Sequence, residues 1–271
     1  MSSHAAKEPI GPTLRPRAHV TSAAGNLYAP RALPVLVEAF ETDPNFTYYL
    51  NKLPKASRPK SLEKIIELML VIGELNNATF YESGAFDPSL GQSPQPLFQS
   101  TAVVMPPGKA ATNFGLRGWI KLLQQGVLKI IWRAGISGLK KILVEYPAKA
   151  EGVKKSVFLE NEQYYYLLII GTGTQHRGKG LAAAIIKEHQ VIAQKEGLPM
   201  YLEASNKGAA KVYEKCGFEH VIVAPDKEFV VGKGECDETG EKANGEHAVG
   251  VRMYPMVWWP GGYVRGKAAR V

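Results

Sequence analysis

The chain has 271 residues, of which 45% are hydrophobic and 21% charged, the balance of a globular protein that forms one large domain or two small ones. Its longest uninterrupted apolar run, residues 164–170, is too short to span a bilayer, which takes about 20 residues, and its polar, proline-rich start predicts neither a secretory signal nor a transit peptide. The net charge of +8 is concentrated in one segment, Lys109–Lys155, which contains ten Lys or Arg and two Glu.

Cysteine and histidine usage argues against a disulfide framework and against a metal site. Cys216 and Cys236 are the only cysteines, they lack CxxC spacing, and the histidines form no close pair with a thiol or a carboxylate. Two thiols in a chain of this length are typical of a reducing compartment. We therefore expect a cytoplasmic protein without a bound metal.

The N-terminal third alternates irregular, helical and extended patterns. Residues 1–29 are rich in Pro, Gly and Ala and predict an irregular arm, apart from a short strand near Thr13–Val20. The stretches "PRALPVLVEAFETDP" and "SLEKIIELMLVIGEL" carry apolar residues at helical spacing, and Ser61 is the expected N-cap of the second helix. "ATFYES" and "LFQSTAVVM" predict two strands separated by a loop.

A basic helical region is predicted at residues 113–155. One apolar stripe runs along it, formed by Leu116, Ile120, Leu123, Val127 and Ile131. Basic and apolar faces together would suit an anionic membrane surface or a nucleic acid. An apolar stripe more often faces a core, so we expect neither a membrane nor a nucleic acid as partner.

The C-terminal half is predicted to alternate strands and helices. "YYYLLII" reads as a buried strand, a glycine-rich loop follows it, and a helix then runs to about Glu196, where Gly197 and Pro199 end it. "MYLEA" predicts a strand, "NKGAAKVYEKC" a short helix, "HVIVAP" with "EFVV" a strand, and "VGVRMYPMVWW" a last strand after a long hairpin loop. This mixed order predicts an α/β (α+β) fold with one domain at residues 30–260 and a tail at residues 261–271. The last strand is a candidate for pairing across a homodimer.

The loop "GTGTQHRGKGL" resembles three phosphate-binding templates and fits one of them. The dinucleotide fingerprint GxGxxG fails because His176 stands where the third glycine belongs. The Walker template fails because Gly180 replaces the Ser or Thr that binds Mg²⁺. The pattern Gln-x-x-Gly-x-Gly fits throughout, from Gln175 to Gly180. Glycines let the backbone approach an anion, and the start of the next helix attracts it; a tight turn with exposed basic residues is the alternative.

Two segments in the right order resemble the GCN5-related N-acetyltransferase (GNAT) superfamily. "QHRGKGLA" resembles its acyl-CoA pyrophosphate loop, and "NKGAAKVYEKCGF" resembles its helix from an Asn to a Tyr. The resemblance is specific over Tyr164–Phe218, and the layout of the chain is most similar to the puromycin N-acetyltransferase branch. It implies a single mixed central sheet flanked by helices, with residues 113–155 as a helical insertion that precedes the loop strand and covers the acceptor site.

The resemblance also implies a binding mode for acetyl-CoA, the one co-substrate that we expect. The thioester would lie in a wedge between two splayed parallel strands, where Ile170 and Thr172 would bind the pantetheine arm and the acetyl carbonyl. Asn206 would contact that arm or cap its helix. The pyrophosphate would bind at the loop, formed by Gln175, His176, Arg177, Gly178, Lys179, Gly180 and Leu181.

Within this resemblance, Tyr213 and Glu203 are the expected catalytic residues. A tyrosine with a pKa of about 10 is protonated at neutral pH, so Tyr213 would protonate the leaving thiolate; core packing is the alternative. Glu203, at the end of its strand, would take a proton from the substrate ammonium or form an ordinary salt bridge. The predicted function is N-acetylation of a small-molecule amine by direct transfer. O-acetylation, or a non-catalytic CoA-binding or membrane-associated protein on the same fold, remains an alternative.

Overall fold

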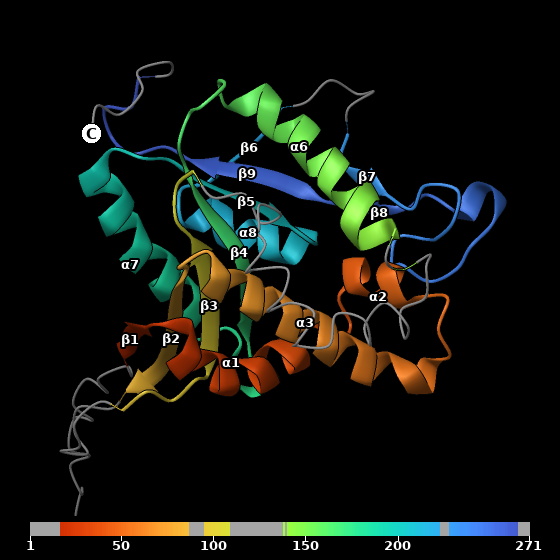
Figure 1. Ribbon diagram of the computed structural model, residues 1–271, viewed down its shortest axis with the longest axis horizontal. Helices are drawn as coiled ribbons and strands as arrows, with labels where there is room; N and C mark the ends of the chain where they lie inside the picture. Colours follow the sequence, from red (N-terminus) through yellow and green to blue (C-terminus); the bar gives the residue numbers. More distant parts are fainter. Residues whose placement is uncertain (1–16, 87–94, 109–137, 139, 223–227, 265–271) are drawn as a thin grey trace, which may run out of the picture.

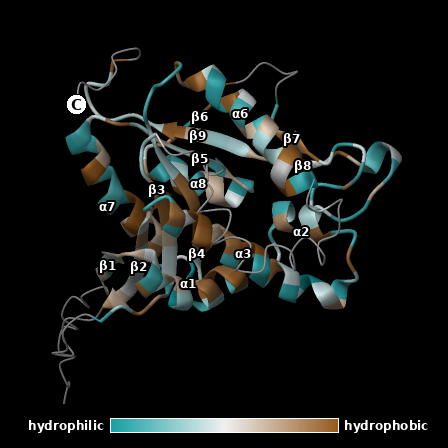
Figure 2. Ribbon diagram, in the orientation of Figure 1, coloured by the Kyte–Doolittle hydropathy of each residue, from teal (hydrophilic) through white to brown (hydrophobic). Residues whose placement is uncertain are grey.

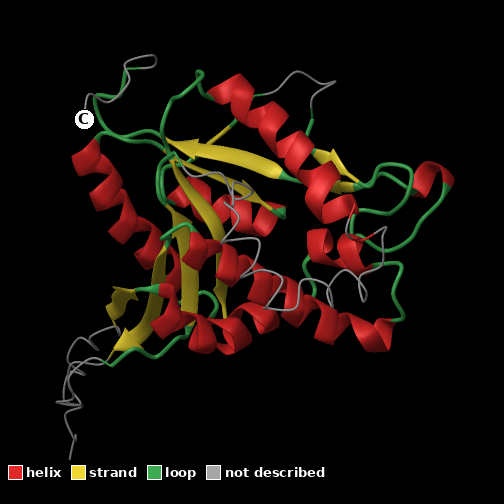
Figure 3. Cartoon of the chain, viewed as in Figure 1, coloured by secondary structure: helices red, strands yellow, loops and turns green. Residues whose placement is uncertain are grey.

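One mixed sheet runs through the centre of the protein (Figures 1 and 3). The structure is a computed structural model, and it describes residues 17–86, 95–108, 138, 140–222 and 228–264. Its seven strands lie side by side in the order β1 (Arg17–Ala23), β2 (Thr79–Phe86), β3 (Ser100–Met105), β4 (Tyr165–Thr172), β5 (Met200–Ala204), β9 (Tyr254–Trp258) and β6 (Glu219–His220). Only β4 and β5 are parallel neighbours. β7 (Val230–Val231) and β8 (Val251–Arg252) form a separate antiparallel pair.

Helices cover both faces of the sheet and enclose two hydrophobic cores. The first core lies against α1 (Gly25–Phe40), α2 (Pro44–Leu50), α3 (Arg58–Leu75) and α6 (Tyr146–Val157). The second lies against α7 (Leu181–Glu196) and α8 (Lys207–Lys215). Hydrophobic and hydrophilic residues alternate along α3, α6 and α7, as expected of helices with one buried face (Figure 2). The predicted mixed sheet flanked by helices is confirmed.

The predicted irregular arm contains a strand, as expected near Thr13–Val20, but it is also ordered from residue 21 to residue 29, where an irregular chain was expected. Residues 17–23 form β1, which pairs antiparallel with β2, and α1 begins at Gly25, well before the prolines that marked its predicted start. Tertiary contacts hold this extra turn: the Tyr28 hydroxyl forms a hydrogen bond of 2.6 Å with Thr21, and its ring packs edge-on against Phe98. The expected strand at Thr13–Val20 is found at residues 17–20 and extends to Ala23; residues 13–16 lie outside the described part of the chain.

Ser61 is not the N-cap of α3, which begins at Arg58. The Ser61 hydroxyl donates to the Ser57 carbonyl at 3.0 Å, so it lies inside the first turn. Long-range contacts fix the earlier start, because the Arg58 guanidinium binds Glu241 of the hairpin loop. The local sequence pattern that predicts an N-cap gives no information on this contact between distant residues.

Neither edge of β9 is free along its whole length. β9 pairs with β5 on one side and, at Met256 and Val257, with β6 on the other. These neighbours occupy part of the edge that pairing across a homodimer would use, and that pairing stays a prediction. Within the described residues no helix combines the length and the apolar character needed to cross a membrane. The apolar stripe Leu116–Ile131 lies outside those residues; α6 and a π-helical turn at Lys141–Glu145 are described from the basic region.

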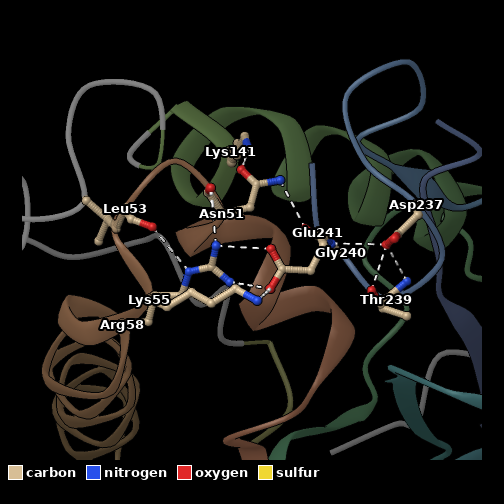
Figure 4. Close-up of polar contacts among 9 residues, drawn as sticks. All are labelled: Asn51, Leu53, Lys55, Arg58, Lys141, Asp237, Thr239, Gly240 and Glu241. Carbon is tan, nitrogen blue, oxygen red and sulfur yellow. Dashed lines mark hydrogen bonds and ion pairs between the residues drawn. The ribbon is translucent and has the colours of Figure 1, made fainter. Parts of the chain in front are cut away.

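The predicted hairpin loop connects β7 to β8 and is fastened to α2 and α3 (Figure 4). Arg58 donates two hydrogen bonds, of 2.5 and 3.0 Å, to the Glu241 carboxylate, and Asn51 Nδ2 donates to the Gly240 carbonyl at 3.0 Å. Lys141 Nζ donates at 3.0 Å both to the Tyr48 carbonyl and to Asn51 Oδ1, and burial lowers the pKa of this ammonium. The loop thus braces the helices that face the cavity described below.

His189 gives the second core a pH-dependent stability. It is 1% exposed, Nδ1 shares a hydrogen bond of 2.9 Å with the Tyr81 hydroxyl, and burial lowers its pKa to about 4. The unfolded chain, with a pKa of about 6.5, binds more protons between these values, so this stability is complete above pH 6.5 and is lost as the pH falls toward 4. We expect His189 to reduce the free energy of unfolding by about 2 kcal/mol between pH 7.5 and pH 5.

Urea unfolding at both pH values tests this with His189→Asn, which keeps an acceptor for Tyr81 but does not titrate. The variant should lose about 2 kcal/mol less than wild type on acidification. His220→Asn is the control, because His220 is exposed and pairs with Glu214 at the surface. An equal loss in wild type and His189→Asn would contradict the assignment.

Candidate active site

A cavity of about 1080 Å³ lies where β4 and β5 separate. The two strands pair only at Tyr165↔Met200 and Tyr166↔Tyr201, at the start of each strand. Just beyond, β4 carries a bulge: Val103 and Val104 of β3 pair with Ile169 and Leu167, which leaves Leu168 unpaired. A bulge bends its strand and increases the local twist. The bend accounts for the divergence of β4 from β5, which opens the wedge that the resemblance implied.

The glycine-rich loop lies at one end of this cavity. Gly178 and Gly180 both have φ of +77°, which favours glycine, and an added Cβ at either would meet no atom within 4 Å. Gly178, Gly180 and the first residues of α7, from Leu181, line the cavity. The backbone donors at the start of this 16-residue helix and its positive end therefore face the cavity. This arrangement fits the pyrophosphate of CoA.

Some of the charged and polar side chains of the loop line the cavity, and others do not. Arg177 lines the cavity, but its guanidinium donates to the carbonyls of Thr172 (3.4 Å) and Ala39 (3.2 Å) and so ties the loop to α1. His176 also lines the cavity. Gln175 and Lys179 are exposed and are not among the lining residues, although Lys179 Nζ lies 3.4 Å from His176 Nδ1.

Ile170 and Thr172 line the cavity from β4, as predicted. Both pair with β3 on the far side, while the side toward β5 has no ladder partner at these residues. The Thr172 hydroxyl donates to Ser100 at 2.9 Å and its carbonyl accepts from Arg177 at 3.4 Å, so both groups are already engaged. Asn206 also lines the cavity and caps α8, its Oδ1 accepting from Ala209 N at 2.9 Å.

Tyr213 faces the same cavity from α8. Its side chain is 8% exposed and its ring packs against Phe218 with a centroid distance of 5.9 Å. No hydrogen bond of its hydroxyl occurs within the described part of the chain. Burial raises the pKa of Tyr213 strongly, and nearby Cys216 and Asp43 raise it further. The hydroxyl is therefore kept protonated, as a proton donor requires. Cys216, only 7% exposed, packs in the second core.

Glu203 lies at the opposite side of the wedge, among tyrosines. Oε2 accepts a hydrogen bond of 2.7 Å from the Tyr166 hydroxyl, while Oε1 is buried without a hydrogen-bond partner in the described residues. Burial raises the pKa of Tyr146, Tyr166 and Tyr201, and the Glu203 carboxylate raises each further. Leu202, the neighbour of Glu203 in β5, packs in the second core.

Asp43 is a functional candidate that the sequence did not reveal. Asp43, 6% exposed, lines the cavity, caps α2 through Asn45 N and Phe46 N, and accepts a hydrogen bond from Ser205 at the end of β5. Burial raises the pKa of Asp43. The motif "TDP", with its acid before Pro44, signals a helix cap, but nothing local signals its proximity to Tyr213. In the described residues no group of three His, Cys, Asp or Glu side chains is placed to hold a metal ion.

Sequence comparisons agree with this geometry. Residues 146–218 match the profile of the Acetyltransferase (GNAT) family. An uncharacterized N-acetyltransferase of the fission yeast Schizosaccharomyces pombe is 24% identical over 189 residues, which cover 69% of this chain and 69% of the yeast protein. The range matched by the family runs from α6 to the end of α8 and thus contains the loop, Glu203 and Tyr213.

Solved structures show the same fold. A histone acetyltransferase HPA2 and related acetyltransferase from Corynebacterium glutamicum has a TM-score of 0.50 at 18% identity, with 92% of this chain and 98% of that chain covered. A putative arylalkylamine N-acetyltransferase 7 from the yellow fever mosquito Aedes aegypti has a TM-score of 0.52 at 11% identity, with 89% and 87% covered. At such identities the likeness is one of fold.

Proposed function

Because this chain belongs to the GNAT acetyltransferase superfamily, we propose that it transfers the acetyl group of acetyl-CoA to the amine of a small molecule. The observation that carries the proposal is the cavity at the split between β4 and β5. It is lined by the free strand edge at Ile170, the loop at Gly178 and Gly180, and the side chains of Glu203 and Tyr213. The mosquito protein is named for an arylalkylamine acceptor, which is consistent with an amine here.

Each part of the cavity has one proposed task. Acetyl-CoA, when bound, supplies an activated acyl group and a thiolate leaving group. The start of α7 holds its pyrophosphate, and the edge of β4 orients its pantetheine arm beside Tyr213. Glu203 accepts a proton from the acceptor ammonium, directly or through water, and Tyr213 donates one to the leaving sulfur. Direct transfer needs no nucleophile of the protein.

Thiol release from acetyl-CoA, measured with a panel of primary amines and alcohols, tests the proposed function. We expect turnover with amines and formation of the N-acetyl product by mass spectrometry. Turnover with alcohols alone would favour O-acetylation. Calorimetric binding of CoA without turnover of any acceptor would favour a non-catalytic CoA-binding protein and would contradict the proposal.

The loop has its own test in Gly178→Asp. Aspartate tolerates a positive φ better than most residues, and the open space around Gly178 leaves room for it. The new carboxylate would lie beside the pyrophosphate, so we expect the KM for acetyl-CoA to rise by about tenfold or more, the effect of one repulsive charge contact. Gly234→Asp, with φ +87° and similar open space, is the control away from the cavity. An unchanged KM for acetyl-CoA in Gly178→Asp would contradict the binding of the pyrophosphate at this loop.

A further inference from the structure

Lys154 carries a positive charge into the acceptor side of the cavity without a carboxylate partner. It lines the cavity from α6, and its Nζ lies 4.2 Å from the ring centroid of Tyr166 and 5.6 Å from that of Tyr201. Among the described residues its ammonium forms no ion pair and no hydrogen bond. Cation–π contacts position an ammonium but leave its three N–H donors available.

Glu203 provides the complementary group across Tyr166. The Tyr166 hydroxyl donates to Oε2, while Oε1 accepts no hydrogen bond, although the Tyr201 hydroxyl, which likewise lacks a partner in the described residues, lies near this carboxylate. Lys154 and Glu203 form no direct ion pair in the described residues; both contact Tyr166, Lys154 at the ring and Glu203 at the hydroxyl. One tyrosine side chain therefore separates a free cation from a carboxylate oxygen without a donor. A small molecule with an ammonium at one end and a carboxylate at the other would match both.

We propose that the acceptor is an amino carboxylate, whose amine lies at Glu203 and whose carboxylate binds Lys154. This inference rests on the proposed N-acetyltransferase function and names its substrate class. A simple cationic amine would leave Lys154 unpaired and would be repelled by it, whereas an amino acid satisfies both charges. Pairs of this kind are charge-assisted and select strongly against a ligand that lacks one partner.

The charge distribution of the chain supports this assignment. The basic segment Lys109–Lys155 contains only two carboxylates, Glu145 and Glu151. Glu145 accepts hydrogen bonds from the Tyr48 hydroxyl (2.7 Å) and from Gly232 N (2.9 Å), and Glu151 lies 3.9 Å from Lys155. Glu151 also lines the cavity, but its side chain is 60% exposed and forms no ion pair with Lys154 in the described residues. An anionic group on the acceptor would neutralise Lys154.

Matched acceptors test the proposal. Phenylalanine, leucine and histidine are compared with their methyl esters and with 2-phenylethylamine, 3-methylbutylamine and histamine, which keep the amine but lose the negative charge. For at least one of the free amino acids, the kcat/KM of wild type should exceed that for its methyl ester and that for the corresponding amine by about 10- to 100-fold. This is the range of a charge-assisted hydrogen bond. Lys154→Met should abolish most of that preference, chiefly through KM, and Lys154→Arg should restore part of it.

Lys155→Met is the matched control, because it removes the same charge from the next residue, whose side chain is 76% exposed. It should keep the preference of wild type. This inference would be overturned, while the proposed function stands, if the esters and amines were acetylated as efficiently as the amino acids. It would also be overturned if Lys154→Met and Lys155→Met lost the preference equally. No turnover of any amine, ester or amino acid would overturn both.

Discussion

Tyr213→Phe is expected to lower kcat by about 100- to 10,000-fold, the contribution of a positioned general acid, while the affinity for CoA changes little. The change removes one oxygen from a side chain that lines the cavity and whose ring packs against Phe218. Phenylalanine keeps that packing. The loss would therefore report the proton that Tyr213 supplies to the leaving sulfur. Thiol release at saturating substrates and calorimetric CoA binding measure the two effects separately.

The pH dependence adds a second readout. Burial raises the pKa of Tyr213 above its usual value near 10, so the hydroxyl stays protonated as the pH rises through that value. We expect no decline of kcat near pH 10 from Tyr213 in wild type. Tyr165→Phe is the control: Tyr165 belongs to the same core but donates to Glu196, and it does not line the cavity. A similar loss in both variants, or none in Tyr213→Phe, would remove Tyr213 from the proposed role.

Gly240→Ala is expected to lower the free energy of unfolding by at least about 3 kcal/mol, the range of a substitution that forces the backbone apart. Gly240 has φ of +84°, and a Cβ there would lie 2.2 Å from the Pro44 carbonyl oxygen and 2.6 Å from Tyr48 N. Both atoms belong to α2, so neither moves without shifting the helix. Because α2 carries Asn45 and Tyr49 to the cavity, the KM for the acceptor should also rise.

Urea unfolding of Gly240→Ala and Gly234→Ala separates the cost of the steric contact with α2 from the cost of the left-handed backbone conformation. Gly234 has φ of +87° but open space around it, so alanine there costs only the left-handed conformation, about 1–2 kcal/mol. The difference between the variants measures the close approach of the hairpin loop to α2. Equal destabilisation would show that the loop is not packed on α2 as described.

Patterns local in sequence predicted most of the fold. The buried run at β4, the helix that ends at Gly197 and the β7–β8 hairpin were all recognisable from periodicity and from turn residues. The failures share one cause. The early start of α1 depends on Tyr28 binding Thr21, and the start of α3 depends on Arg58 binding Glu241, which are contacts between distant parts of the chain. Tertiary contacts of this kind override local signals.

The candidate site divides in the same way. Residues within the two motifs, such as Gly178, Asn206 and Tyr213, were found because their spacing resembles a known family, and the cavity brings them together. Asp43 and Lys154 come from helices outside the motifs. Their sequence surroundings indicate only a helix cap and a basic surface. Their relation to the cavity depends on how α2 and α6 pack against the sheet.

The unpaired Leu168 also changes the phase of its strand. Before it, Tyr165 and Leu167 face the second core and Tyr166 the first; after it, Ile169 faces the first core and Ile170 the second. This reversal turns Gly171 toward α1, where an added Cβ would lie 2.8 Å from that of Ala39. An evenly alternating strand would direct a larger side chain there. The extra residue in β4 thus lets α1 pack close to the strand, where the Ala39 carbonyl accepts a hydrogen bond from Arg177. The position of the glycine-rich loop therefore depends on the number of residues in β4.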